Sequence, residues 1–323
     1  MSVQHDAIPP PVHPSIRVGS PPERWPRWRG LWALTRPGFL WLSISAALLG
    51  LAGHTGWRTE DIWRAALILF LIAAAHAAIN AWNDVHDALS GADASNLDRF
   101  APFCGGSRAL QEGGLDGIDA RHLVLALGAV SVGGGLWLAL HAEPALLWIG
   151  ALGLLLGWAY SAPPLALMRR GLGEVTVAVC WGLIPVGARL ALGDGVAGLG
   201  WLMPLAPAFG ACAILVVANI ADADADRANG KRTLVVQLGP QHSRMLFIAL
   251  QSALWLLLVG AVWLDEWPRW TLLALLALPF SLLAIRRANA ARASREPLRH
   301  AIPAAIQTSL VFNLALALGF ALA

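Results

Sequence analysis

The sequence predicts an all-α protein that crosses a membrane many times. Of its 323 residues, 57% are hydrophobic and only 13% are charged, and the mean hydropathy is +0.60. Soluble globular proteins carry about 25% charged residues. A helix needs about 20 mostly apolar residues to cross the hydrocarbon core of a bilayer. Nine segments of the chain approach that length, so we expect nine transmembrane helices.

The region before these segments has a different composition. Residues 1–29 hold seven prolines and have no apolar core of the kind that a secretory signal peptide requires. We expect them to form a disordered, Pro-rich cytoplasmic tail that ends in an interfacial patch of tryptophans and arginines. Residues 30–323 are expected to form a single membrane domain.

The apolar segments follow one another with connections of very different length. Prolines inside several of them are compatible with membrane helices, because neighbouring helices can satisfy the backbone groups that a proline frees. The two longest connections, near residues 83–120 and 220–241, are both rich in carboxylates. The nine segments lie near residues 33–53, 62–82, 121–141, 144–161, 172–192, 198–219, 242–263, 269–286 and 302–322.

The distribution of basic residues predicts the orientation. The tail and the connections after the second, fourth, sixth and eighth segments together hold 18 basic residues, whereas the opposite side holds three. Cytoplasmic loops are enriched in Lys and Arg, so the N-terminus is expected in the cytoplasm and the C-terminus outside. Of the 23 basic residues 22 are Arg, and they are spread between apolar runs, which does not indicate a nucleic-acid partner.

A first polar cluster ends the second apolar segment. Asn80, Asn83, Asp84 and Asp87 are spaced i, i+3, i+4 and i+7, which places them on one face of a helix, and His76 lies one turn earlier on that face. Like charges at this spacing repel one another. Mg²⁺ takes oxygen ligands and commonly connects carboxylates to the phosphates of a substrate. The cluster therefore favours a bound divalent cation.

A second polar cluster ends the sixth segment. Asn219, Asp222 and Asp226 share one helical face, while Asp224 points to the opposite side, where we expect it to be solvated. Three cations follow, of which Lys231 is the only lysine in the chain. Either cluster alone would be explained as an interfacial helix cap. Two such faces on the same side of the membrane predict a metal-dependent site for a diphosphate.

These motifs resemble those of the UbiA superfamily of intramembrane prenyltransferases. The residues NDVHDALSGAD (83–93) and NIADADADRANGKRTLVVQLG (219–239) are similar to its two aspartate-rich motifs. LTRPGFL (34–40) and YSAPPLALMRRGLGE (160–174) agree with it in order and spacing. The resemblance covers the chain from about residue 33 to its end.

The resemblance implies a nine-helix bundle around a central cavity, in which two or more Mg²⁺ ions hold the diphosphate of a polyprenyl substrate. It also implies roles for individual residues. The implied metal ligands are Asp84, Asp87, Asp93, Asp222 and Asp226, and four of these, Asp84, Asp87, Asp222 and Asp226, are expected to be catalytic together with Tyr160. The implied diphosphate ligands are Asn83, Asn219, Lys231, Arg232, Arg108 and Arg36, and the implied cavity residues are Asn80, His76 and Ser161.

The first motif also indicates the acceptor. Asp93 follows Asp87 by six residues, and the loop continues to a GGSR sequence that ends at Arg108. This pattern resembles 1,4-dihydroxy-2-naphthoate prenyltransferases of menaquinone synthesis in bacterial plasma membranes. The alternative is 4-hydroxybenzoate or another aromatic acceptor, as in ubiquinone synthesis. We expect the active site to face the cytoplasm and no obligatory protein partner.

Three positions depart from the family pattern. Ala221 stands where the second motif usually carries Arg, and Ala166 and Met168 stand where Arg and Lys are usual. Arg169, Arg170 and Arg227 are the nearest cations that could replace them. A membrane transporter is the remote alternative, but its intramembrane charges would lie near the bilayer midplane and not at one face. The signature of a phosphatidyltransferase packs several aspartates with DG and AR in one segment, and the apolar segment at 121–141 contains no aspartate.

Overall fold

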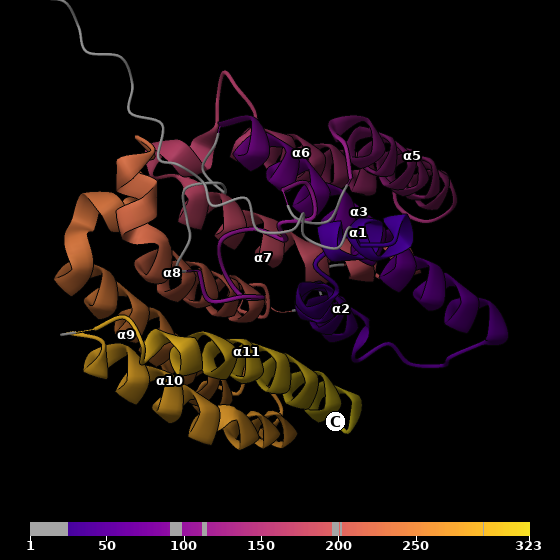
Figure 1. Cartoon of the computed structure of the whole chain (residues 1–323). Coiled ribbons are helices and arrows are strands. Elements are labelled where there is room, and N and C mark those ends of the chain that lie inside the picture. The colour runs from indigo at the N-terminus through magenta and orange to yellow at the C-terminus, as the bar shows by residue number, and fades with distance from the viewer. Residues whose placement is uncertain (1–24, 91–98, 112–114, 196–199, 201, 293) are drawn as a thin grey trace, which may run out of the picture.

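The computed structural model describes residues 25–323 except 91–98, 112–114, 196–199, 201 and 293. All regular elements in these residues are helices, as the sequence predicts (Figure 1). The α-helices are α1 (Arg27–Leu34), α2 (Pro37–Leu51), α3 (Thr59–Ser90), α5 (Gly117–His141), α6 (Ala145–Ser161), α7 (Gly173–Leu192), α8 (Leu205–Ala228), α9 (Leu234–Trp263), α10 (Leu278–Ala290) and α11 (Leu298–Ala321). Two 3₁₀ segments, η1 (Leu167–Arg170) and η3 (Arg269–Ala277), complete the set.

Each of the nine apolar segments corresponds to a helix or to two consecutive helices. Within the described part of the chain, seven spans are long and apolar enough to cross a bilayer, with η3 and α10 counted as one. An eighth results if α1 and α2, which are bent by 42° at their junction, form one span. The remaining segment, α6, is apolar but has only 17 residues. Length and composition thus support seven or eight spans, and the count of nine stays a proposal.

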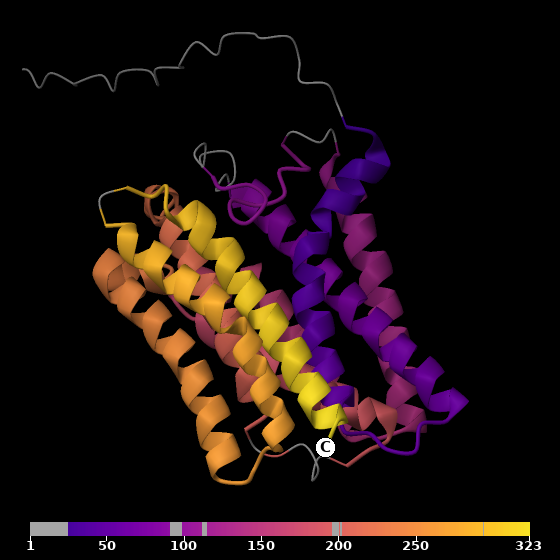
Figure 2. The ribbon, with the colours of Figure 1, turned by 90° about the horizontal axis from the view of Figure 1, so that it is seen from below.

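The helices are arranged as two connected groups (Figures 1 and 2). In the first group, α2, α3, α5, α6 and α7 contact one another in sequence, and α7 also packs against α2. In the second, α8, α9, η3, α10 and α11 pack together. The groups are joined by the contacts of α7 with α8 and of α2 with α11.

Small residues allow the closest helix contacts. A Cβ atom added at Gly50 of α2 would lie 2.1 Å from the carbonyl oxygen of Pro185 in α7. Only glycine fits there, because any side chain would push the two backbones apart. Small residues at helix interfaces are typical of membrane bundles, in which close packing replaces the hydrophobic effect as the force that holds helices together.

The two groups differ in how they fill their interiors. The second group has two hydrophobic clusters, one around Phe247 and the other around Phe312 and Leu316, and all three side chains are fully buried. Its helices α8 and α11 are the most buried spans of the bundle. The first group instead surrounds a cavity, which α8 closes on one side.

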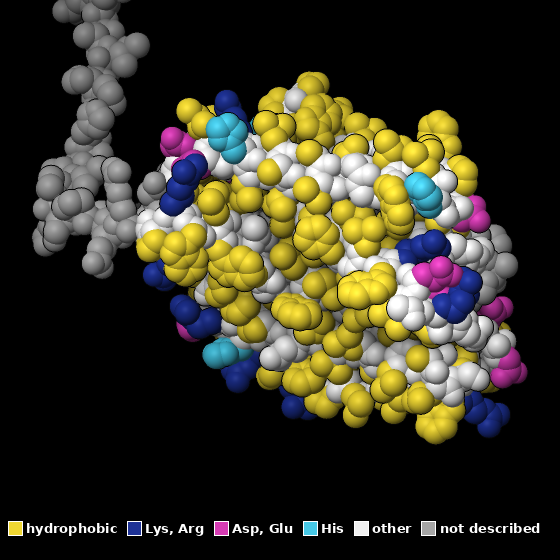
Figure 3. Space-filling model, turned by 90° about the vertical axis from the view of Figure 1, so that its right-hand side faces the viewer, with side chains coloured by type: hydrophobic (Ala, Val, Ile, Leu, Met, Phe, Trp, Pro, Cys, Tyr) yellow, Lys and Arg dark blue, Asp and Glu magenta, His cyan; other side chains and the backbone are white. Residues whose placement is uncertain are grey.

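The outer surface is apolar over a wide area. Figure 3 shows a broad field of hydrophobic side chains, with charged side chains gathered toward its edges. Large apolar residues such as Trp148 and Trp263 are about four-fifths exposed. Such a surface would aggregate in water and is typical of contact with lipid. The chain is therefore an integral membrane protein.

The start of the membrane domain differs slightly from the predicted boundary. Residues 1–24 of the expected tail lie outside the described residues, but α1 already begins at Arg27. The guanidinium of Arg27 pairs with Asp119 at the start of α5, and that of Arg29 lies 5.1 Å from the centre of the Trp25 ring. Residues 25–29 therefore belong to the folded part of the chain.

Candidate active site

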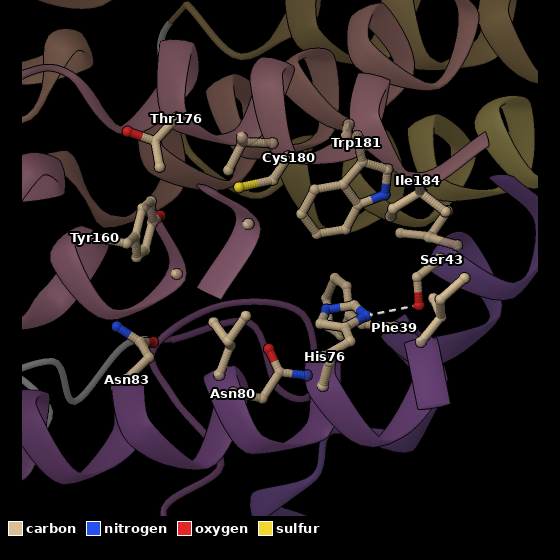
Figure 4. Close-up of a pocket in the computed structure, with 18 of the residues that line it drawn as sticks. Phe39, Ser43, His76, Asn80, Asn83, Tyr160, Thr176, Cys180, Trp181 and Ile184 are labelled. Carbon is tan, nitrogen blue, oxygen red and sulfur yellow. Dashed lines mark hydrogen bonds between the residues drawn. The ribbon is translucent and has the colours of Figure 1, made fainter. Parts of the chain in front are cut away.

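A cavity of about 670 Å³ lies between the helices of the first group and α8. Residues from α2, α3, α5, α6, α7 and α8 line it, together with the loop after α3 and the turn after α8. Of the described residues, none from α9, α10 or α11 takes part, so the cavity occupies one side of the bundle. Most of its wall is apolar, and Figure 4 shows the part formed by α2, α3, α6 and α7. Its carboxylates and Lys231 lie where α3 ends and where α8 ends.

The structure brings ten of the predicted site residues to the wall of this one cavity. They come from segments up to 195 residues apart, which shows that the two polar clusters meet in space. The ten lining residues are Arg36, His76, Asn80, Asn83, Asp87, Tyr160, Asn219, Asp222, Asp226 and Lys231.

The first cluster is held by Arg36, which lies at the junction of α1 and α2. Its guanidinium pairs with the Asp84 carboxylate and donates a 3.2 Å hydrogen bond to Oδ1 of Asn83. Asp84 is only 2% exposed, and it also accepts a 3.1 Å bond from the backbone N–H of Ser107. Asp84 therefore lies behind the cavity wall, while Asp87, one turn further, faces the cavity.

Arg36 adopts an unusual backbone conformation. Its φ of +48° and ψ of +61° fall in the left-handed region, which is costly for a residue with a side chain. Arg108, in the loop after α3, has a φ of +62° and is 6% exposed. Such strain persists only where the surroundings enforce it, and it is found most often at functional sites.

The second cluster is positioned by α7 and by the loop after α3. Asn219 donates a 3.1 Å hydrogen bond to Oε1 of the buried Glu174, which fixes its amide orientation. Asp222 accepts a 3.1 Å bond from the backbone N–H of Gly105. Gly105 has a φ of +71°, a conformation that glycine adopts without strain, and this turns its N–H toward α8.

Lys231 connects the two clusters. Its ammonium lies 2.8 Å from Oδ1 of Asp87 on α3 and 3.7 Å from Oδ1 of Asp226 on α8, and the residue is 5% exposed. A single buried cation thus neutralises carboxylates from two helices that would otherwise repel one another. The turn after α8 holds it in place, because the Lys231 N–H donates a 2.9 Å bond to the carbonyl of Asp226.

The loop after α3 contributes backbone groups that residue types alone did not indicate. Through Gly105 and Ser107 it donates one N–H to a carboxylate of each cluster. The paired glycines at 105 and 106 were the available sequence signal for such a close approach. Burial, together with the nearby Asp222 carboxylate, raises the pKa of Cys104 in this loop to about 12. Its thiol is therefore neutral and not a nucleophile.

The other predicted residues lie outside the cavity wall. Ser161 is buried and accepts a 3.0 Å hydrogen bond from the Asn83 amide, so it supports a lining residue. Arg108 is buried near the cavity without lining it, and the side chain of Arg232 is exposed. Asp224 is exposed and pairs with Arg227 at 3.0 Å. Asp93 lies outside the described residues.

The three cations expected to replace the missing basic residues all bind elsewhere. Arg169 donates to the carbonyl of Asn229 and Arg170 to that of Pro164, and neither lines the cavity. A different arginine contacts the second motif. Arg295, between α10 and α11, donates to the carbonyl of Ala221 and lies 5.6 Å from the ring centre of Phe100.

The oxygen donors suit a hard divalent cation, but they do not form a complete site alone. Among the described residues, no three His, Cys, Asp or Glu side chains are close enough to bind one metal ion. Asp87, Asp222 and Asp226 line opposite walls of the polar end. Mg²⁺ usually keeps several ligands from water or phosphate, so these carboxylates fit a cation whose remaining ligands come from a substrate.

Comparisons with known proteins agree with this arrangement. The model of the UbiA prenyltransferase family matches residues 39–311. A 1,4-dihydroxy-2-naphthoate octaprenyltransferase of Mycobacterium tuberculosis is 30% identical over 81% of this chain and 86% of its own length. The enzyme of the same name from Mycobacterium leprae is 29% identical over 80% and 84%. A solved UbiA homolog from Archaeoglobus fulgidus, bound to GPP and Mg²⁺, has a TM-score of 0.64 at 17% identity and covers 91% of this chain and 100% of that one.

Proposed function

Because the chain belongs to the UbiA prenyltransferase family, we propose that it transfers a polyprenyl group from a prenyl diphosphate to 1,4-dihydroxy-2-naphthoate in menaquinone synthesis. That the chain is a prenyltransferase follows from the family and from relatives of that activity. The relatives in both mycobacteria are named for this acceptor, which supports the choice.

One structural observation supports the proposal most. Carboxylates and cations from two helices converge at one end of a large apolar cavity, with Lys231 between Asp87 and Asp226. A polyprenyl diphosphate likewise has a charged end and an apolar end, since its diphosphate is joined to a long apolar tail. The polar end suits the diphosphate, and the apolar wall suits the tail and an aromatic ring.

The reaction requires stabilisation of a leaving diphosphate. The bond between the first prenyl carbon and the diphosphate oxygen breaks, and its electron pair stays on the oxygen. The allylic carbon then bonds to an electron-rich ring carbon, which loses its carboxyl group as CO₂. Lys231 and Arg36 line the polar end and supply fixed positive charge toward the departing diphosphate. Because both are held by carboxylates, they need no large rearrangement.

Mg²⁺ is the proposed cofactor. Asp87, Asp222 and Asp226 would hold it from the cavity wall, and Asp84 and Asp93 are the further ligands that the motifs imply. When bound, the cation would neutralise charge that develops on the diphosphate. Asn83 and Asn219, whose amides are fixed by Arg36, Ser161 and Glu174, would help to position the diphosphate.

We also propose nine membrane spans, with α6 as a short span and with α1 and α2 as one bent span. The excess of basic residues on one side supports a cytoplasmic N-terminus and a polar cavity end that faces the cytoplasm, in a bacterial plasma membrane. The diphosphate would then enter from the aqueous side, and the prenyl tail would lie along the apolar wall.

The test uses membranes that contain the full-length protein. They are incubated with a labelled prenyl diphosphate, with Mg²⁺ or a chelator, and with either 1,4-dihydroxy-2-naphthoate or 4-hydroxybenzoate. We expect prenylation of the naphthoate only, loss of product with the chelator, and recovery when Mg²⁺ is added back. Prenylation of 4-hydroxybenzoate alone would replace the proposed acceptor, and no product from either would reject both.

A further inference from the structure

The part of the cavity wall at His76 lies far from the carboxylates of the polar end. His76 and Asn80 lie on the cavity face of α3, 11 and 7 residues before Asp87. At 1.5 Å per residue, His76 is about 16 Å from Asp87 along the helix axis. That distance leaves room for a diphosphate and an aromatic ring between them, so His76 must contact another part of a substrate.

The hydrogen bonds of Ser43 determine the tautomer of His76. The Ser43 hydroxyl donates its only proton to the carbonyl of Leu40 at 2.9 Å. Its oxygen lies 2.9 Å from Nδ1 of His76 and can then only accept, so we assign the imidazole proton to Nδ1. The charged group that acts on this ring is the cation of Arg36, so an imidazolium in this apolar cavity would be costly. The ring is therefore neutral, and Nε2 is a hydrogen-bond acceptor.

The side-chain amide of Asn80 is also fixed by a hydrogen bond, with its NH₂ group turned away from the cavity. Its Nδ2 donates a 3.0 Å hydrogen bond to the carbonyl of Thr35, which can only accept. The amide orientation is thus fixed, with Oδ1 on the other side. Figure 4 shows this oxygen, and the His76 nitrogen that does not contact Ser43, directed into the cavity.

The two acceptors form one recognition surface. Residues four apart on a helix lie about 6 Å apart along its axis, so both side chains can contact one aromatic ring. Trp181 of α7 closes the opposite side, with its ring centre 5.1 Å from that of His76 in an edge-to-face arrangement. This part of the cavity therefore combines aromatic surface with two acceptors.

We propose that this surface binds the aromatic acceptor through its hydroxyl groups, which donate to Nε2 of His76 and Oδ1 of Asn80. The inference rests on the proposed function and deepens it. A phenolic hydroxyl that donates to imidazole gives its ring more electron density, which favours attack on the allylic carbon. The same bonds orient the ring between Trp181 and the polar end. A ligand that lacks hydroxyl groups would leave both acceptors unpaired.

The test is His76→Phe, which keeps an aromatic ring but removes the acceptor. KM is measured separately for the naphthoate acceptor and for the prenyl diphosphate. We expect KM for the naphthoate to rise about tenfold, as the loss of one good hydrogen bond predicts, and KM for the prenyl diphosphate to stay unchanged. The matched control is His122→Phe, which replaces an exposed histidine of α5.

A second comparison tests the hydroxyl group directly. The wild-type protein should prefer the free naphthol over its methyl ether, which cannot donate, by about tenfold. His76→Phe should lose this preference. Ser43→Ala should weaken it, because Nδ1 loses its partner and the proton is free to move to Nε2. If His76→Phe does not fold, the preference of Ser43→Ala for the free naphthol over its methyl ether tests the proposal instead.

Two outcomes would overturn the inference without affecting the proposed function. One is naphthoate turnover by His76→Phe with an unchanged KM and an unchanged preference for the free naphthol. The other is a rise in KM for the prenyl diphosphate alone, which would show that the prenyl tail occupies this wall. Absence of naphthoate turnover in the wild-type protein would instead reject the proposed function.

Discussion

The two ends of the bundle both carry clusters of carboxylates and cations, but they use them differently. At one end, Asp87 and Asp226 face each other across a cavity with Lys231 between them. At the other end, Asp61 and Asp194 lie near the start of α3 and just after α7. About 39 Å of α3 separates Asp61 from Asp87.

In the second cluster, around Asp61 and Asp194, the polar side chains bind one another and do not face the cavity. We call it the closed cluster. Oδ2 of Asp194 lies 2.9 Å from Nδ1 of His54 and 3.3 Å from Nε of Arg189. Asp61 accepts a 2.9 Å hydrogen bond from the backbone N–H of Arg58. Arg189 also donates to the carbonyl of Ala52, which ends α2. These contacts tie α2, α3 and α7 together, and none of the side chains that make them lines the cavity.

The comparison shows that charge at the end of a membrane helix does not identify a site. Both ends have buried or half-buried aspartates with cationic partners. Only the end that contains Asp87, Asp226 and Lys231 has several of these side chains on the wall of a cavity that a substrate could fill. The open cluster consists of Asp87, Asp222, Asp226 and Lys231, which line the cavity. We therefore expect substitutions there to change turnover, and substitutions at the closed cluster to change stability.

The largest effect on turnover is expected for Asp222→Asn. The change keeps the size of the side chain but removes a charge that would bind a divalent cation. Turnover should fall on the order of 10²–10³-fold, as it does when one group that stabilises developing charge is removed. The control is Asp224→Asn, two residues along α8, where the side chain is exposed and pairs only locally with Arg227. Equal activity of the two variants would contradict the role of Asp222.

A smaller loss is expected for Lys231→Met. Without the ammonium, Asp87 and Asp226 lose the cation between them and the leaving diphosphate loses a fixed positive charge. Turnover should fall about 10- to 100-fold, and Lys231→Arg should recover part of it. Arg232→Met is the matched control, because this neighbouring side chain is exposed. A loss of activity in the control as large as in Lys231→Met would remove the distinction between them.

The closed cluster should give the smallest change in turnover. Asp194→Asn weakens the contacts with His54 and Arg189, so the free energy of unfolding should fall by about 1–3 kcal/mol. KM and kcat should stay within about twofold of wild type at a temperature where both proteins are folded. Thermal unfolding in detergent and the prenylation assay measure the two effects. A kinetic defect with unchanged stability would show that this end of the bundle also takes part in catalysis.

Much of the site could be predicted because helical periodicity is local. The spacing of Asn80, Asn83 and Asp87 placed them on one face before any fold was known, and the structure has all three on the cavity wall. The same reasoning placed Asp224 on the solvent side, where it lies. Periodicity also placed Asp84 on this face, but it could not show that Arg36 and the Ser107 amide would cover its carboxylate.

The contacts of the arginines near the three missing basic residues could not be predicted either. Sequence neighbours suggested Arg169, Arg170 and Arg227, yet their side chains bind backbone carbonyls or Asp224 outside the cavity. The arginine that reaches the second motif is Arg295, 74 residues beyond Ala221. Its position depends on how α11 packs against α8, which no local pattern encodes.

The amino-acid sequence was sufficient for the all-helical membrane fold, for the family and for the faces that carry the polar residues. Each of these depends on composition or on the regular repeat of one helix, both of which can be read along a single segment. The tertiary structure decided which groups meet: Lys231 between two helices, the loop amides on both clusters, and the free acceptors of His76 and Asn80. These depend on side-chain orientations set by contacts between helices distant in the chain, and such contacts exist only once the bundle has packed.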